Sequence, residues 1–214
     1  MYKLITTVKK QPQVTADDLW TWWCDQADWV LAIPQVKGYR INAALVRPGH
    51  TPAFDGVSEI WIEDPADLAP LQQALAGLSE AATAFLDPAG YRPLLTQERV
   101  ILAEPPAGSA EVKLCEVVNR RPDLSWDQFD RHWAEQHPIL VTRLKGLIGY
   151  YQHPAVQTGQ TPAYDGHVMV WFDRLENARQ SLRTPEGEAV LADEKLFIDP
   201  NRLERVAVRE HRFR

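Results

Sequence analysis

The chain has 214 residues, of which 45% are apolar and 24% are charged, and its formal net charge is −6. This composition is typical of a folded globular protein and argues against intrinsic disorder. Lys and Arg gather in no single segment, and no apolar run approaches the ~20 residues of a membrane span, which argues against partners such as nucleic acid or a membrane.

The first half of the chain predicts an alternating series of strands and helices. Residues 2–8 alternate between apolar and polar side chains, as a half-buried strand does. A helix follows Thr15, with Asp18 three residues later as the partner in a capping box. Strands are predicted at 39–47 and 57–63, with Asp55-Gly56 as a hairpin turn of positive φ. A helix at 64–75 and a strand at 97–102 complete the series.

The second half repeats this pattern at an offset of about 110 residues. Its predicted strands are the counterpart of 2–8 and residues 150–156, 167–173 and 203–209. Its helices follow Ser125 and cover 175–182, and Asp165-Gly166 is the equivalent turn. Residues 105–109 (PPAGS) have the composition of a linker. We therefore predict two repeats, 1–104 and 110–214, joined by that linker. The aligned identities include Lys3-Leu4 with Lys113-Leu114, Val8 with Val118, Pro12 with Pro122, Trp23 with Trp133, and Gln26 with Gln136.

The order of elements in each repeat is β-α-β-β-α-β, the ferredoxin-like split unit of the α+β class. Both helices of such a unit cover one face of its sheet, so the other face needs a second layer. We therefore expect the two repeats to pack sheet to sheet as a pseudo-dimeric α+β barrel, with a pocket between the sheets. A further homodimer is compatible with this arrangement.

Histidine and tryptophan are divided unequally between the repeats. Residues 1–104 contain one histidine, His50, and most of the tryptophans, including the cluster Trp20-Thr-Trp-Trp23. Residues 110–214 contain the other five histidines. We therefore expect titratable chemistry in the second repeat and a scaffold in the first. The tryptophan cluster indicates either an aromatic-lined pocket or a core or interface face of a helix.

Several motifs of the second repeat resemble the EthD domain family of the dimeric α+β barrel superfamily. They are His132-Trp-Ala-Glu-Gln-His137-Pro138, Gly149-Tyr150, Tyr164-Asp-Gly166 and Asp193-Glu-Lys-Leu-Phe197. The first repeat departs from them, with Ala27-Asp28 in place of the His-Pro pair and Ala81-Ala82 in place of Asp193-Glu194. The resemblance implies a barrel fold and a range of roles: cofactor-free monooxygenases, lactone isomerases, polyketide cyclases or dehydratases, and proteins of unassigned role.

His137 is the main candidate for catalysis. It follows the first helix of the second repeat and precedes Pro138, which disfavours helical geometry at His137 itself. An imidazole at such a break can enter a pocket and act as a general acid or base on an enolisable or phenolic substrate. The alternative is a histidine that ends the helix and bonds a carbonyl.

Other residues of the second repeat are candidates to position the substrate. His153 and Tyr151 share one side of their strand and Tyr150 shares the other with Gln152, and either side can face the pocket. With His137, the predicted catalytic residues are therefore His153 and Tyr150. His132 is either a satisfied histidine beside the core or a substrate contact, and Asp193-Glu194 is either an orienting pair for a histidine or an exposed pair at a helix end. The predicted substrate-binding set is Trp133, His132, Tyr151, Trp171, Asp193 and Glu194.

No sequence motif for a metal, nucleotide or other cofactor is present, so none is predicted. The leading hypothesis is a cofactor-independent enzyme that acts by proton transfer, or by oxygen insertion, on an apolar or aromatic carbonyl or polyketide-like compound. A second hypothesis is a protein that binds a small hydrophobic molecule, or accompanies a partner enzyme in a degradation pathway, without catalysis. A third, implied by the resemblance, is haem binding through a histidine. Two cysteines and the lack of a targeting segment predict a cytoplasmic protein.

Overall fold

The computed structural model describes residues 1–46, 49–159 and 161–213, and the side chains of all of these except residues 78–80. Arg47, at the end of the predicted strand 39–47, lies outside the described residues. The chain divides into two compact units. The first comprises Met1–Glu98, Val156–Ala163 and Val208–Arg214, and the second comprises Arg99–Ala155 and Tyr164–Ala207.

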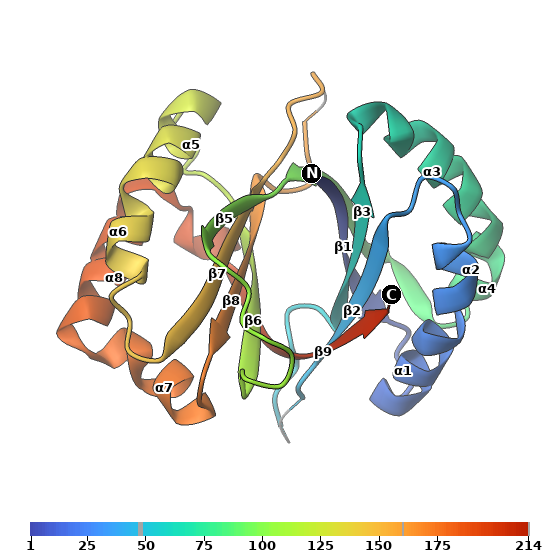
Figure 1. Ribbon diagram of the computed structural model, residues 1–214, viewed down its shortest axis with the longest axis horizontal. Helices are drawn as coiled ribbons and strands as arrows, with labels where there is room; N and C mark the ends of the chain where they lie inside the picture. Colours follow the sequence, from blue (N-terminus) through green and yellow to red (C-terminus); the bar gives the residue numbers. More distant parts are fainter. Residues whose placement is uncertain (47–48, 160, 214) are drawn as a thin grey trace. The chain divides into compact units, whose positions relative to one another are not determined.

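The first unit is an antiparallel sheet with helices on one of its faces (Figure 1). Its strand order is β4-β1-β3-β2, followed by the last residues of β9. The strands are β1 (Tyr2–Lys10), β2 (Gly38–Ala44), β3 (Gly56–Ile62) and β4 (Leu86–Gln97), and the helices are α1 (Ala16–Asp25), α2 (Ala27–Leu31), α3 (Leu68–Leu75) and α4 (Ser79–Ala82).

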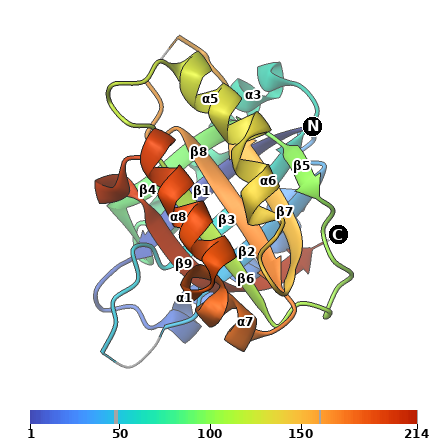
Figure 2. The same ribbon diagram turned by 90° about the vertical axis from the view of Figure 1, so that its left-hand side faces the viewer.

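The second unit has the same architecture, with α5, α6 and α8 covering one face of its sheet (Figure 2). Its strand order is β9-β6-β8-β7-β5, and β9 begins in this unit. The strands are β5 (Arg99–Leu102), β6 (Val112–Val118), β7 (Leu147–Pro154), β8 (Gly166–Phe172) and β9 (Glu204–Phe213), and the helices are α5 (Trp126–Glu135), α6 (His137–Val141), α7 (Leu175–Gln180) and α8 (Pro185–Phe197).

The predicted α+β class and the β-α-β-β-α-β order are confirmed in both repeats. Both helix starts are also confirmed, because Thr15 with Asp18 and Ser125 with Gln128 form reciprocal capping boxes. Apolar side chains on the helix-covered face of each sheet form a core, which includes Trp23 in one unit and Trp133 in the other.

The strand predicted at 97–102 is present as Arg99–Leu102, but it does not complete the first repeat. The fourth strand of the first repeat is β4, which ends at Gln97 and pairs with β1. Residues 99–102 are a separate strand, β5, which pairs with β7 of the second unit. The alternation of apolar residues identified a strand here, but it carries no information about the pairing partner.

The predicted Asp-Gly hairpin turns are also wrong. Gly56 and Gly166 are the first residues of β3 and β8, and neither is among the glycines with positive φ. A Cβ atom at either glycine would lie 2.5 Å from a ring carbon of Trp23 or Trp133, respectively. These positions therefore need glycine because an indole ring packs on the backbone.

Candidate functional site

His137 is the first residue of α6, at the break between α5 and α6. Pro138 stands in the first turn of α6, where a missing N–H removes no helical hydrogen bond. The ring of His137 is buried, with 7% of the side chain exposed, and it bonds a side chain of α8 rather than a carbonyl at the end of α5. The partner of Nδ1 is therefore a carboxylate and not a carbonyl at a helix end, and the role of His137 stays a prediction.

Asp193 of α8 joins the two histidines of the His-Pro motif. Its Oδ1 lies 2.8 Å from His132 Nε2, and its Oδ2 lies 2.8 Å from His137 Nδ1. Phe197, one turn further along α8, packs against both imidazoles at centroid distances of 4.7 and 5.0 Å. One carboxylate and one phenyl ring thus fix the orientation of both histidines.

This geometry assigns the proton on His137. A carboxylate only accepts hydrogen bonds, so Nδ1 of a neutral His137 carries the proton, and this N–H donates a hydrogen bond to Asp193. Nε2 is then the unprotonated nitrogen. Burial lowers the pKa of His137 below the ordinary value for histidine, and the adjacent Asp193 carboxylate opposes this shift. At neutral pH His137 is therefore a neutral imidazole with a basic Nε2.

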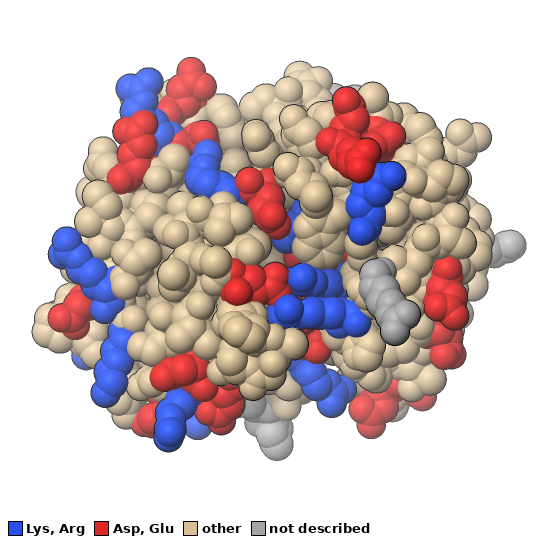
Figure 3. Space-filling view, in the orientation of Figure 1, with Lys and Arg blue, Asp and Glu red and all other residues tan. Residues whose placement is uncertain are grey.

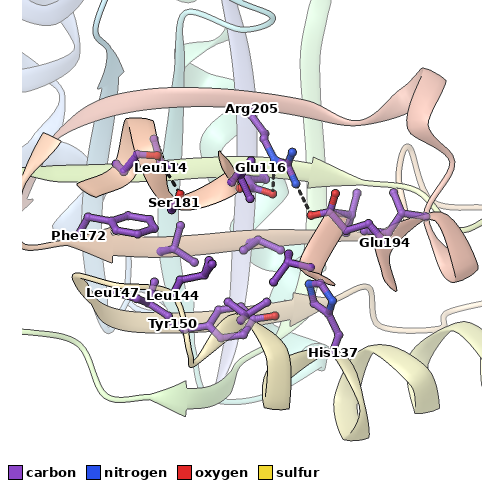
Figure 4. Close-up of a pocket in the computed structure, with 18 of the residues that line it drawn as sticks. Leu114, Glu116, His137, Leu144, Leu147, Tyr150, Phe172, Ser181, Glu194 and Arg205 are labelled. Carbon is purple, nitrogen blue, oxygen red and sulfur yellow. Dashed lines mark hydrogen bonds and ion pairs between the residues drawn. The ribbon is translucent and has the colours of Figure 1, made fainter. Parts of the chain in front are cut away.

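Glu194, the neighbour of Asp193, is buried and belongs to a charged cluster with the partly buried Glu116 of β6 and Arg205 of β9 (Figure 4). Arg205 Nε forms an ion pair with Glu116 Oε2 at 3.0 Å, and its Nη2 donates a hydrogen bond to Glu194. Burial raises the pKa of Glu194 to about 7, and the nearby Glu116 carboxylate also raises it, whereas Arg205 opposes the shift. A substantial fraction of Glu194 is therefore protonated near neutral pH.

These groups line a cavity of about 70 Å³ between the helices and the sheet of the second unit (Figure 4). Most of its wall is aliphatic, whereas His137, Glu194, Glu116 and Arg205 supply the polar part. The apolar lining includes Leu114, Val118, Val141, Leu144, Leu147, Val168, Val170, Phe172, Leu182, Val190 and Ile198.

Tyr150 and Trp133 line the same cavity. Gln152 holds them together, because its Nε2 donates to the Tyr150 hydroxyl at 2.7 Å and to the Trp133 carbonyl at 2.8 Å. Burial raises the pKa of Tyr150 above its ordinary value, so the phenol stays neutral. Tyr150 can bond a substrate but is a poor source of a phenolate.

The structure does not bring His153, Tyr151 or Trp171 to this cavity. Tyr150 and Gln152 share the helix-covered face of β7, so Tyr151 and His153 lie on the opposite face. There Tyr151 makes an edge contact with Trp171 at 5.4 Å, and His153 lies 6.4 Å from His167. The predicted residues thus divide into two groups, one on each side of the sheet.

Glu116 and Arg205 were not predicted. In β6, residues Val112, Leu114, Glu116 and Val118 share the core-facing side, so Glu116 is a charged residue in a series that is otherwise apolar. A charged side chain at a core-facing strand position is rare unless it is paired. The presence of Glu116 in this apolar series was therefore the sequence feature that could have predicted a charged pair here.

Comparisons with known proteins support this assignment of fold. Residues 121–201 match the EthD domain. The EthD resemblance of the second repeat is therefore confirmed, and the matched residues include His132, His137, Asp193 and Glu194. A search of curated proteins gave no match.

Solved structures share the architecture at low sequence identity. An anthrone oxidase-like protein is 10% identical with a TM-score of 0.66, and the match covers 99% of this chain and 92% of that chain. A mutant chlorite dismutase from Candidatus Nitrospira defluvii is 11% identical with a TM-score of 0.56, covering 97% and 91%. An EthD family protein from Bacillus halodurans C-125 is 20% identical with a TM-score of 0.39, covering 45% and 95%. At these identities the first two similarities show the fold alone.

The described residues also bear on cofactors and surfaces. Within them, no group of three or more His, Cys, Asp or Glu is placed to hold a metal ion, and no helix is both long and apolar enough to cross a membrane. On the face drawn in Figure 3, acidic and basic side chains are interspersed. A haem does not fit beside His137, because 70 Å³ is less than half of the ~150 Å³ cavity that holds one benzene ring.

Proposed function

We propose that the second unit catalyses proton transfer on an enolisable carbonyl compound, with His137 as the base and Glu194 as the acid. The observation that carries this proposal is the pairing of His137 with Asp193 at the wall of a buried cavity that also contains Glu194. A basic imidazole and a protonated carboxyl group at neutral pH are the two groups that enolisation requires.

The proposed reaction begins when His137 Nε2 removes a proton from the carbon next to the carbonyl. The electron pair of the C–H bond forms the C=C bond of an enol, and the carbonyl π electrons move to oxygen. Glu194 donates its proton to that oxygen, while the positive charge of Arg205 stabilises the developing negative charge. Asp193 stabilises the imidazolium that forms at His137.

Later steps decide the class of enzyme, and they share this first step. Return of the proton at another carbon gives an isomerase, and loss of the β-hydroxyl as water gives a dehydratase. Attack of the enol carbon on dioxygen gives a hydroperoxide, which loses water to leave one oxygen atom in the product, as a monooxygenase does. The name of the anthrone oxidase-like protein supports a carbonyl substrate, because anthrone is an enolisable aromatic ketone.

The size of the cavity limits which part of a substrate can enter. A volume of about 70 Å³ holds a carbonyl group with its neighbouring carbons but not an aromatic ring. An aromatic or polyketide-like substrate would therefore place only its reacting end beside His137, unless the walls move.

A small ketone tests the proposal directly. We expect the protein to accelerate exchange of the α-protons of hydroxyacetone in D₂O, followed by NMR, and His137→Ala to lower the rate by about 10²–10⁴-fold. His50→Ala, an exposed histidine of the first repeat, is the matched control and should retain the full rate. Exchange at the full rate in folded His137→Ala protein would exclude His137 as the base.

A further inference from the structure

The first unit contains a larger cavity, of about 430 Å³, between its own helices and sheet. Its position matches that of the His137 cavity in the other repeat, because aligned residues such as Leu4 and Leu114, or Trp23 and Trp133, line the two. A volume of 430 Å³ lies within the range of small-molecule sites in proteins. It is about three times the volume of a cavity that holds one benzene ring.

Aromatic side chains form a fixed wall of this cavity. Trp22 stacks on Phe85 at a centroid distance of 5.0 Å, with the rings nearly parallel at 12°. Trp23 is buried and hydrogen-bonds the hydroxyl of Tyr39, which is also buried. Flat, immobilised rings of this kind favour a flat apolar ligand, because little side-chain entropy is lost on binding.

A row of hydroxyl groups supplies the polar part of the lining. Thr6 of β1 and Ser58 of β3 are directly paired in the sheet, so their side chains lie next to each other on the cavity face. Tyr91 of β4 hydrogen-bonds Thr6. The three hydroxyls can donate to a carbonyl oxygen or accept from a phenol.

The lining is neutral. Among the described residues that line this cavity, none carries a formal charge. The aligned positions of the second repeat show what has been replaced: Thr6 stands where that repeat has Glu116, Ala27 where it has His137, and Ala82 where it has Glu194. A charged ligand would lose its hydration without gaining an ionic partner, so it is disfavoured.

We propose that the cavity of the first unit is a binding site for a neutral aromatic ketone or phenol of about two fused rings. The rings stack against Trp22 and Trp23, and the oxygen bonds the hydroxyls of Ser58 and Thr6. The site has the shape and contacts for binding but lacks the acid and base of the second unit. It does not depend on catalysis at His137.

Two matched ligands, two cavity-filling variants and a control variant test this proposal. The ligands are 2-acetylnaphthalene, a neutral ketone, and 2-naphthoate, which has the same rings and a negative charge. We expect isothermal titration calorimetry to show one site for the ketone and at least tenfold weaker binding of the acid. Ala82→Phe and Ser58→Phe fill the cavity from the helix side and the sheet side, and each should weaken ketone binding at least tenfold.

The control for Ala82→Phe is Ala81→Phe, which adds the same ring to an exposed neighbour on α4. It should bind the ketone as the wild type does. Thermal unfolding checks that each variant is folded. Ketone binding that persists in both folded cavity-filled variants, or no binding to the wild type, would each overturn the proposal.

Discussion

The two repeats place a cavity at the same position, but they line it with different chemistry. In the second unit His137, Glu194 and Glu116 occupy the wall and the cavity measures about 70 Å³. In the first unit the aligned residues are Ala27, Ala82 and Thr6, and the cavity measures about 430 Å³. Smaller neutral side chains therefore enlarge the cavity and remove the acid and base at the same time.

One packing arrangement is kept in both repeats despite these changes. Trp22 stacks on Phe85 in the first unit, and the aligned His132 stacks on Phe197 in the second, at centroid distances of 5.0 and 4.7 Å. The comparison shows that a shared helix-on-sheet scaffold can carry either an aromatic wall or a histidine pair. The first repeat, which we expected to be only a scaffold, contains the larger cavity.

The aligned phenylalanines provide the largest expected effect. Phe197 is fully buried and contacts His132, His137 and Phe129, whereas Phe85 is only half-buried. Phe197→Ala should lower the free energy of unfolding by about 3–5 kcal/mol, and Phe85→Ala by about half as much, because it leaves a smaller void. Urea denaturation followed by circular dichroism measures both. The control is Leu196→Ala, 57% exposed in the wild type; equal losses for the two phenylalanines would contradict the difference in burial.

Asp193→Asn should have the next largest effect, and it acts only in the second repeat. The carboxylate of Asp193 accepts one hydrogen bond at each oxygen, whereas the amide of asparagine has one accepting oxygen and one donating NH2 group. The variant therefore cannot accept a hydrogen bond from both imidazoles, and the orientation and tautomer of His137 are lost. We expect kcat for hydroxyacetone exchange to fall about 100-fold while KM changes little. Glu188→Gln, on the exposed side of the same helix, should have no effect. A kcat within twofold of wild type would show that Asp193 does not position the base.

The order of elements was predictable because local patterns are repeated in the chain. Both helix starts followed from capping boxes, and both repeats showed the same alternation of strands and helices. Helix α8 was not predicted. Its buried residues are Gly187, Val190, Glu194 and Phe197. Two of the four are not apolar, so the helical periodicity was hidden.

The site was only partly predictable. His137 could be chosen from its place before Pro138 and from the EthD resemblance. Its contact with Asp193 spans 56 positions of the sequence, and nothing local encodes it. The side of β7 that faces the cavity could not be predicted either. Alternation distinguishes only a buried from an exposed side of a strand, and here Tyr150 and His153, on opposite sides, are both buried.

Substitution of the aligned glycines, Gly56 and Gly166, should destabilise the two repeats equally, in contrast to substitution of the phenylalanines. Gly56→Ala and Gly166→Ala each place a Cβ atom 2.5 Å from a tryptophan ring carbon, so the indole or the strand must shift. We expect each variant to lose about 1–3 kcal/mol of unfolding free energy, by urea denaturation. Gly77→Ala adds a Cβ with ordinary spacing of 3.9 Å from Trp29 and is the control. A neutral effect at one of the paired glycines would show that the two packing arrangements differ.

The smallest expected effect is the pH dependence, which belongs to the second repeat alone. The exchange rate should rise as His137 loses its proton below pH 6.5 and fall as Glu194 loses its proton near pH 7. Glu194→Gln cannot ionise, so its slower reaction should lack the alkaline fall, measured as the rate ratio between pH 6 and pH 9. A fall of the same size in Glu194→Gln would assign it to another group.

The stability of Glu194→Gln tests independently whether the pKa of Glu194 is raised in the folded protein. The pKa of Glu194 is raised from 4.5 to about 7 in the folded protein, so its stabilising contribution is complete below pH 4.5 and is lost as pH rises through 7. Glu194→Gln does not ionise, so its stability does not show that loss. Relative to wild type, its free energy of unfolding should therefore increase by about 2 kcal/mol between pH 5 and pH 8, by urea denaturation. A change in the opposite direction would mean that Arg205 outweighs burial at Glu194, and Glu194 would then be ionised at neutral pH and unable to act as the acid.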